Sequence, residues 1–164
     1  MSLKMDDTNL REEDLEPLLS QHLKQDLKVK NCKIWALTHP GDNYSSTMLA
    51  SDIIIQHNNI IAQTLSLVAK LLPPTKFLRE VINIDITFRK EVNAYMLVFP
   101  EFEKLQQEKK VPQNEIFNAF PMFYGARLNC TGDMNEIADE KAILLLENLK
   151  VSGYKTGNRR YGLD

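Results

Sequence analysis

The chain opens with leucines at helical spacing and continues with apolar stretches of a different kind. Within residues 9–28, acidic residues come early and lysines late, as suits a helix dipole. The apolar positions of this segment are Leu15, Leu18, Leu19, Leu23 and Leu27. The pattern predicts an amphipathic helix over residues 9–28 that covers the rest of the domain.

Three segments rich in β-branched and aliphatic residues follow, at about 32–38, 47–56 and 60–72. The connections HPGDNYSS and QHNN have turn-type composition, and Pro73 and Pro74 end the third segment. These features predict an antiparallel meander of three strands.

From Thr75 onward the pattern becomes helical, because Phe88, Val92, Tyr95 and Phe99 fall on one stripe. Pro100 is expected to interrupt this helix, and the charged segment EKLQQEKK to be a solvated helix end or loop. Two further strands are predicted within 120–129 and 141–149, separated by a polar loop. The predicted fold class is α+β: a five-stranded antiparallel sheet with a helix inserted after strand 3 and an N-terminal helix.

A lysine interrupts the apolar third strand, LSLVAKLLP. Side chains of a strand alternate between faces, so Lys70 shares a face with Val68, and the other face is uniformly apolar. Glu91 lies beside the apolar stripe of the following helix and is expected to face the sheet. A semi-buried Lys70–Glu91 pair would leave neither charge buried alone. The alternative, the commoner one for two such residues taken by themselves, is a surface lysine and a solvated glutamate.

Composition narrows the possible classes of protein. The 164 residues suit a single domain, and the net charge of −2 gives no basic field for nucleic acid or an anionic membrane. No apolar run reaches the roughly 20 residues of a membrane span. Cys32 and Cys130 form no CxxC and lie near no histidine cluster, which argues against zinc and for a reduced, cytoplasmic protein.

The order of elements is that of the small lobe of protein kinases. That lobe has a phosphate-covering loop between its first two strands, a lysine on the third strand and a partner glutamate on the inserted helix; a hinge follows the fifth strand. Here Leu67-Val68-Ala69-Lys70 occupies the third-strand position, and Glu147-Asn148-Leu149 ends the last strand as a possible hinge.

Six segments in register carry a more specific resemblance: GDNYSSTML, LVAKLLP, FRKEVNAYMLVFPEFEKL, FPMFYGA, ILLLENLKVSGY and RRYGLD. Together, over about residues 30–164, they resemble the amino-terminal part of the insect ecdysteroid kinase-like, or CHK kinase-like, family, which is related to choline and aminoglycoside phosphotransferases. The resemblance implies a transferase that uses ATP and Mg, with Lys70 on the α- and β-phosphates and Glu91 positioning Lys70. The other implied nucleotide-binding residues are Gly41, Asn43 and Ser46 in the loop, Val68 and Leu146 at the adenine, and Glu147 and Leu149 in the hinge.

The loop departs from the protein-kinase pattern. A G-x-G-x-x-G loop needs three glycines, whereas the same spacing here holds Gly41, Asn43 and Ser46. Taken alone, this motif is a weak signal for a nucleotide loop, and a plain β-hairpin turn is the better explanation of it. The resembled family also tends to have this GDNY-type loop, so the departure is compatible with the resemblance.

The second half of a kinase site has no counterpart in the chain. In the resembled family an H-G-D-type loop and a later D-F-type motif lie in a larger carboxy-terminal lobe, which also supplies the magnesium ligands. None of His22, His39 and His57 is followed two residues later by an aspartate. We therefore expect no catalytic residue or metal ligand here, weak nucleotide affinity and no phosphotransfer by the chain alone.

The expected organisation is a helical segment over residues 1–30, a kinase-like small lobe over 31–146, and a hinge with the start of the larger lobe over 147–164. Three hypotheses remain open. The chain is the truncated, nucleotide-binding lobe of a kinase for an ecdysteroid or another small-molecule alcohol; or it is a non-catalytic module that binds a protein partner or a second copy; or it is an α+β domain unrelated to kinases.

Overall fold

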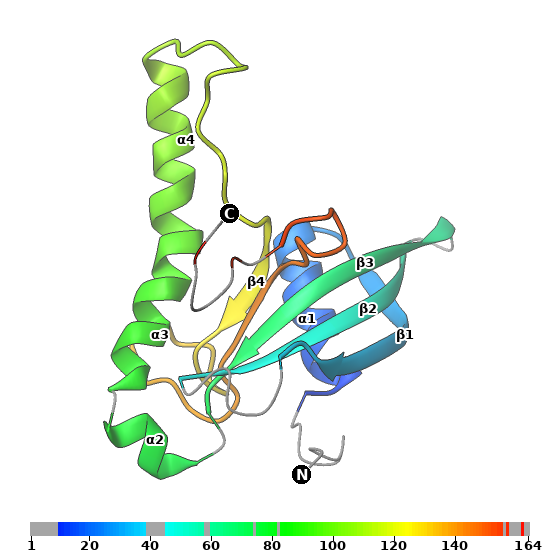
Figure 1. Ribbon diagram of the computed structural model, residues 1–164. Helices are drawn as coiled ribbons and strands as arrows, with labels where there is room; N and C mark the ends of the chain where they lie inside the picture. The colour runs from blue at the N-terminus through cyan, green and yellow to red at the C-terminus, as the bar shows by residue number, and fades with distance from the viewer. Residues whose placement is uncertain are drawn as a thin grey trace.

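The computed structural model describes residues 10–38, 45–57, 60–73, 75–81, 83–155, 157 and 162, without the side chains of 60–62. The predicted loop residues Gly41 and Asn43 lie outside the described residues. In chain order the helices and strands are α1 (Glu12–Leu23), β1 (Leu27–Ala36), β2 (Thr47–His57), β3 (Ile60–Leu71), α2 (Lys76–Val81), α3 (Ile84–Asn93), the π-helix η2 (Ala94–Val98), α4 (Phe99–Glu108), β4 (Phe123–Arg127) and β5 (Ile143–Glu147) (Figure 1).

The strands form one antiparallel sheet in the order β1-β2-β3-β5-β4. This confirms the predicted five-stranded sheet with helices inserted after the third strand. β5 lies between β3 and β4 with both of its faces covered, and its first four residues, ILLL, are all apolar and buried. Ile143 and Leu145 belong to the core on one face, and Leu144 and Leu146 to the core on the other.

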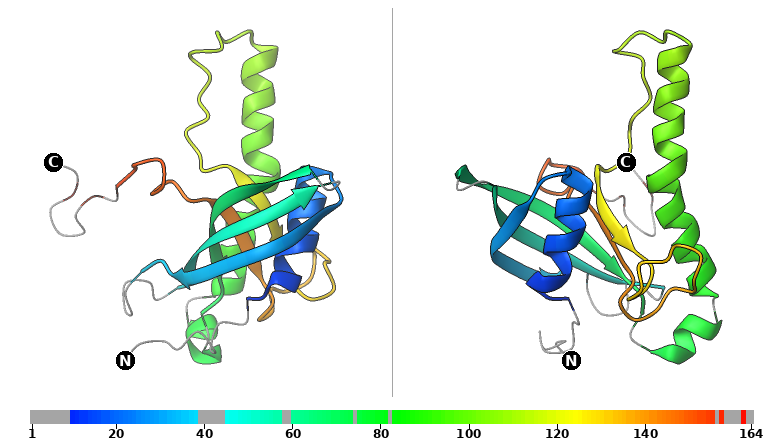
Figure 2. Two further views of the ribbon diagram at one scale, coloured as in Figure 1. Left: turned by 90° about the vertical axis from the view of Figure 1, so that its right-hand side faces the viewer. Right: turned by 180° about the vertical axis from the view of Figure 1, so that it is seen from behind.

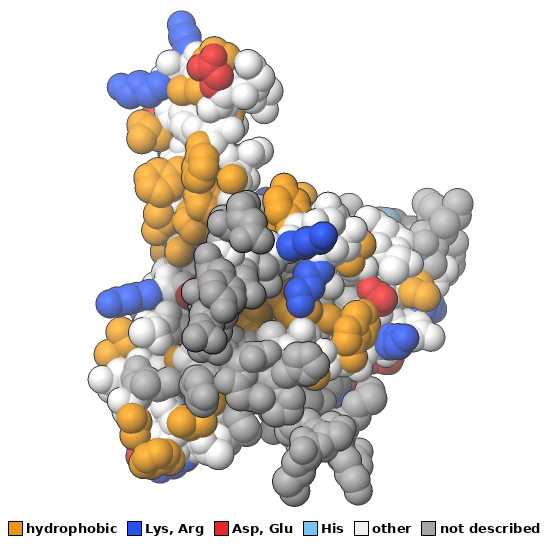
Figure 3. Space-filling view, viewed as in Figure 1, with side chains coloured by type: hydrophobic (Ala, Val, Ile, Leu, Met, Phe, Trp, Pro, Cys, Tyr) orange, Lys and Arg blue, Asp and Glu red, His pale blue; other side chains and the backbone are white. Residues whose placement is uncertain are grey.

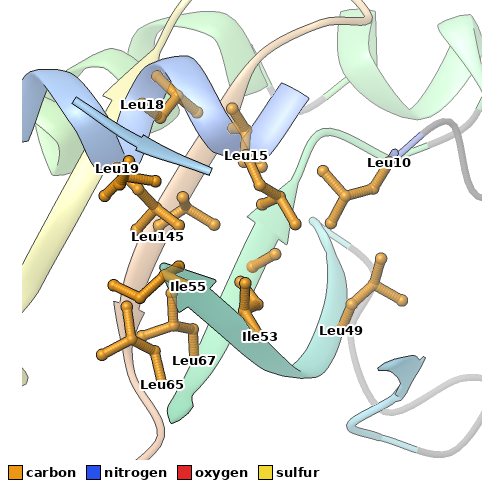
Figure 4. Close-up of a cluster of buried hydrophobic side chains, with 13 residues drawn as sticks. Leu10, Leu15, Leu18, Leu19, Leu49, Ile53, Ile55, Leu65, Leu67 and Leu145 are labelled. Carbon is orange, nitrogen blue, oxygen red and sulfur yellow. The ribbon is translucent and has the colours of Figure 1, made fainter. Parts of the chain in front are cut away.

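One face of the sheet is covered by α1, which crosses it when the molecule is seen from behind (Figure 2). The leucines of α1 point at apolar residues of β2, β3 and β5 (Figure 4). The buried members of this core are Leu10, Leu15, Leu18, Leu19, Leu27, Leu49, Ile53, Ile55, Leu65, Leu67, Ala69, Ile143 and Leu145. The face of β3 opposite Lys70 is therefore core, as predicted.

Two contacts fix α1 against β4. Gly125 has a φ of 139°, and a Cβ there would lie 3.2 Å from the carbonyl oxygen of Leu18, so only glycine suits the position. Arg127 Nη2 donates to Asp14 Oδ1 at 2.8 Å. The helix thus meets the sheet edge both by close backbone approach and by a charged hydrogen bond.

The opposite face is covered in part by α3. Ile84, Phe88 and Val92 repeat at intervals of four and are the buried residues of that helix. The buried members of this second core are Leu72, Ile84, Phe88, Val92, Leu128, Ala138, Ala142, Leu144 and Leu146. The apolar stripe predicted from Phe88 and Val92 therefore rests on β5, beside the strand that carries Lys70.

The amino-terminal helix is shorter than predicted. It ends at Leu23 because Lys24 adopts the left-handed conformation, with a φ of 52°, and β1 begins at Leu27. Leu27 is 2% exposed and faces the same core as the helix leucines. A strand residue can thus continue an apolar pattern that looks helical, and this is why the prediction for residues 24–28 was wrong.

Pro100 does not interrupt the long helix, contrary to prediction. The chain stays helical from Ile84 to Glu108 through the π-helical segment η2. Within it, the Phe99 N–H donates to the carbonyl of Ala94, five residues back. The wider turn precedes Pro100, which then occupies the first turn of α4, where its missing N–H is tolerated.

The end of this helix extends beyond the sheet (Figure 1). Large apolar side chains lie exposed along it, and hydrophobic atoms gather on the same element in the space-filling view (Figure 3). We call these side chains the α4 ridge: they are Met96, Leu97 and Val98 at the end of η2 and Phe102 and Leu105 of α4.

Candidate functional site

Lys70 lies on β3, the central strand of the sheet, opposite Met48 of β2 and Leu144 of β5. Its Nζ donates to Glu91 Oε2 at 2.5 Å. The side chains are 22% and 33% exposed, so both are partly shielded from water. The structure thus brings together the two residues that the sequence pattern paired, and excludes the alternative of a free surface lysine.

Glu91 reaches Lys70 because of how α3 is packed. Burial of Phe88 and Val92 fixes the rotation of the helix, and Glu91, one turn from Phe88, lies at the edge of that buried stripe. A second contact holds the helix: Arg89 donates to the backbone carbonyl of Glu136 in the loop between β4 and β5.

A cavity of about 290 Å³ adjoins the ion pair. Its lining residues are Ser45, Lys70, Ile84, Thr87, Phe88 and Glu91. The cavity lining therefore combines apolar side chains of α3 with an ammonium, a carboxylate and two hydroxyl groups. An ammonium has three donor hydrogens, and Glu91 accepts one hydrogen bond from it, so Lys70 can still donate to an anion.

Two of these residues were not predicted. Ser45 lines the cavity, whereas the predicted loop residue Ser46 is 7% exposed and is not among the lining residues. Thr87 lies one helical turn before Glu91, and its hydroxyl donates to the Ile84 carbonyl at 2.9 Å. Thr87 and Glu91 are four residues apart on one helix, and this spacing could have predicted that both line the same cavity. The orientation of Ser45 depends on the loop conformation, so no pattern in the sequence predicts it.

Val68 and Leu146, predicted at the adenine, are directly opposite each other in the sheet and are each 8% exposed. Residues opposite each other across paired strands point to the same face. The same row continues through Ala50 to Trp35, which is 37% exposed. Trp35 thus lies on the face that carries Lys70. This placement depends on how the strands are aligned, so the sequence pattern did not predict it.

The predicted hinge residues Glu147 and Leu149 end β5 and start a series of turns. The Glu147 N–H donates to the Met122 carbonyl at 2.8 Å, and its carboxylate accepts the Met122 N–H at 3.2 Å. The Leu149 carbonyl accepts the N–H groups of Ser152 and Tyr154, each at 3.1 Å. The Glu147 side chain therefore anchors the segment before β4.

An aromatic group that includes Tyr95 of η2 lies close to Glu91 of the ion pair. Tyr95, one turn after Glu91, lies 5.0 Å from Phe99 and 6.2 Å from Phe123, measured between ring centroids. Burial and, secondarily, the Glu91 carboxylate raise the pKa of the Tyr95 phenol. The residue therefore stays neutral and packs η2 against β4.

No group of three or more His, Cys, Asp or Glu suited to a metal ion occurs in the described part of the chain. Among the described residues that line the cavity, Glu91 has the one carboxylate, and it accepts from Lys70, so the lining does not fit a magnesium site by itself. A search of the described helices found none long and apolar enough to cross a membrane.

No curated protein and no solved structure matched the chain. The sequence model of one family, described as the ecdysteroid kinase-like family, matches residues 40–164, a range that includes Lys70, α3 and the end of β5. That range is most of the chain, and the fold is that of a kinase-like small lobe. The chain belongs to the ecdysteroid kinase-like family.

Proposed function

We propose that this domain is the nucleotide-binding lobe of an ATP-dependent phosphotransferase that acts on a small-molecule alcohol. The observation that carries the proposal is the Lys70–Glu91 pair beside a cavity with hydroxyl groups. Lys70 binds the α- and β-phosphates of ATP, and Glu91 holds its ammonium in place. Kinase-like families use ATP together with Mg, which neutralises phosphate charge when bound.

The remaining predicted residues have defined parts in this proposal. Ser46, with Gly41 and Asn43, belongs to the loop over the phosphates. Val68 and Leu146 contact the adenine, and backbone groups of Glu147 and Leu149 hydrogen-bond to its edge. A larger carboxy-terminal lobe binds the ecdysteroid or other alcohol that accepts the phosphoryl group. The same lobe supplies the magnesium ligands.

Thermal unfolding of the chain with and without ATP·Mg tests the proposal. A ligand that binds only the folded state raises the melting temperature. We expect a small rise with ATP·Mg, none with the variant Lys70→Met, and no phosphotransfer to any alcohol. Sub-micromolar affinity or turnover by the chain alone would contradict the expectation that half of the site lies in the other lobe.

A second candidate is a non-catalytic interaction module, favoured by the α4 ridge. Five large apolar side chains that are 37–59% exposed on one projecting helix are typical of a surface that associates with another chain. Under this alternative the chain self-associates through the ridge and ATP has no effect. Sedimentation of the wild type and of Phe102→Glu distinguishes the two candidates. Loss of association in the variant, together with a melting temperature that does not respond to ATP, supports the second candidate.

A further inference from the structure

Asn148 lies between the two hinge residues and is buried, with 5% of its surface exposed. Burial of an amide side chain is costly unless it is hydrogen-bonded. Its Oδ1 accepts the N–H of Lys150 at 3.2 Å, two residues further along the chain. This is the hydrogen bond of an Asx-turn, in which an asparagine side chain fixes the backbone that follows it.

The backbone of Asn148 is held at both ends. Its N–H donates to the Ser66 carbonyl of β3 at 3.1 Å, and its carbonyl accepts the Val151 N–H at 3.0 Å. A trans peptide unit is planar, so fixing one of its polar groups fixes the direction of the other. The Asn148 N–H shares its peptide plane with the Glu147 carbonyl, and the Asn148 carbonyl shares its plane with the Leu149 N–H.

We infer that Asn148 is a positioning residue for the nucleotide base, an inference that rests on the proposed function. Both backbone groups offered to the base belong to peptide units held by Asn148. Its side chain closes the turn that keeps the second of these units in place. The base therefore meets groups that are oriented before it arrives, which lowers the entropic cost of binding.

The test follows the amide signals of Leu149 and Lys150 by NMR while the ¹⁵N-labelled chain is titrated with ATP, GTP or inorganic triphosphate. In the wild type we expect ATP, but not triphosphate, to shift the Leu149 amide, and ATP to bind several-fold more tightly than GTP. In Asn148→Ala we expect triphosphate affinity to be unchanged and the preference for ATP over GTP to disappear. Asn148→Asp keeps an oxygen for the Lys150 N–H and should keep the preference.

Asn129→Ala is the matched control. Asn129 is also a buried asparagine, 3% exposed, with its Nδ2 donating to the Asp133 carbonyl at 2.6 Å, but it lies in the loop between β4 and β5. We expect this variant to lower the melting temperature without changing the ATP/GTP ratio. A preference for ATP that survives in Asn148→Ala overturns the inference and leaves the proposed function standing.

A wild type that responds to neither ATP nor triphosphate overturns the proposed function and the inference with it. If Asn148→Ala does not fold, the rate of amide hydrogen exchange in the nucleotide-free wild type tests the inference instead. Slow exchange of the Lys150 N–H, which shows a turn formed before the base binds, supports the inference. Fast exchange overturns it.

Discussion

The two faces of the sheet are built differently. The face under α1 is an apolar core with an ion pair, Arg127–Asp14, where the helix meets β4. The face under α3 starts as a similar core around Phe88 and Leu144, but beside it lie a lysine, a glutamate and a cavity. The comparison indicates that the α1 face mainly supplies stability, whereas the α3 face leaves a cavity beside an ion pair, where we propose the binding site.

Removing a core side chain under α1 should have the largest effect. Leu19 is fully buried, so Leu19→Ala should lower the free energy of unfolding by about 2–5 kcal/mol. Denaturant unfolding measures the loss, and Leu105→Ala on the exposed α4 ridge is the control with little change. A Leu19→Ala variant as stable as the wild type would show that α1 is not part of the cooperative core.

A methyl group at the α1–β4 contact should have the next largest effect. Gly125→Ala places a Cβ 3.2 Å from the Leu18 carbonyl oxygen at a φ of 139°, so we expect a loss of about 1–3 kcal/mol. Gly132→Ala, also at positive φ but with open space around it, is the control for backbone strain alone. Equal losses in the two variants would mean that the contact with Leu18 contributes nothing.

The smallest effect should be a dependence of stability on pH that comes from His22 of α1. Burial and, secondarily, the Lys24 ammonium lower the pKa of His22, whose ring lies 5.2 Å from the Phe123 ring. The unfolded chain therefore binds the proton more readily than the folded one. Stability from this group is present above the ordinary histidine pKa of about 6.5 and is lost as pH falls through the lower, folded value.

Melting temperatures of the wild type and His22→Gln between about pH 7.5 and 5 measure this effect. We expect the wild type to lose more than the variant as pH falls. Parallel curves would show that His22 does not contribute to the pH dependence.

The contrast between the faces could be predicted from the sequence because alternation along a strand separates them. The segment around Lys70 has an unbroken apolar face and a broken one, and the helical stripe through Phe88 places Glu91 beside the sheet. Two short-range periodicities were thus enough to suggest the ion pair, and the small-lobe order of the elements was needed to favour it over a surface lysine and a solvated glutamate.

Features that depend on long-range register or on local backbone conformation were not predicted. Trp35 and Val68 share a face only because of how β1, β2 and β3 are aligned. The π-helical turn that admits Pro100 and the left-handed Lys24 that ends α1 leave no clear trace in hydrophobic spacing. The role of Asn148 depends on where the chain turns after β5, which composition does not reveal.

A double-mutant cycle on ATP binding tests the central claim, that the ion pair of the α3 face acts as one unit on the nucleotide. Dissociation constants would be measured for the wild type, Lys70→Met, Glu91→Gln and the double variant. Both charges keep part of their contact with water, so we expect each variant to stay folded, and its melting temperature checks this. We expect Lys70→Met to abolish most ATP affinity and the double variant to bind no more weakly than that single variant, because Glu91 acts through Lys70. Fully additive losses, or wild-type affinity in Lys70→Met, would contradict the account.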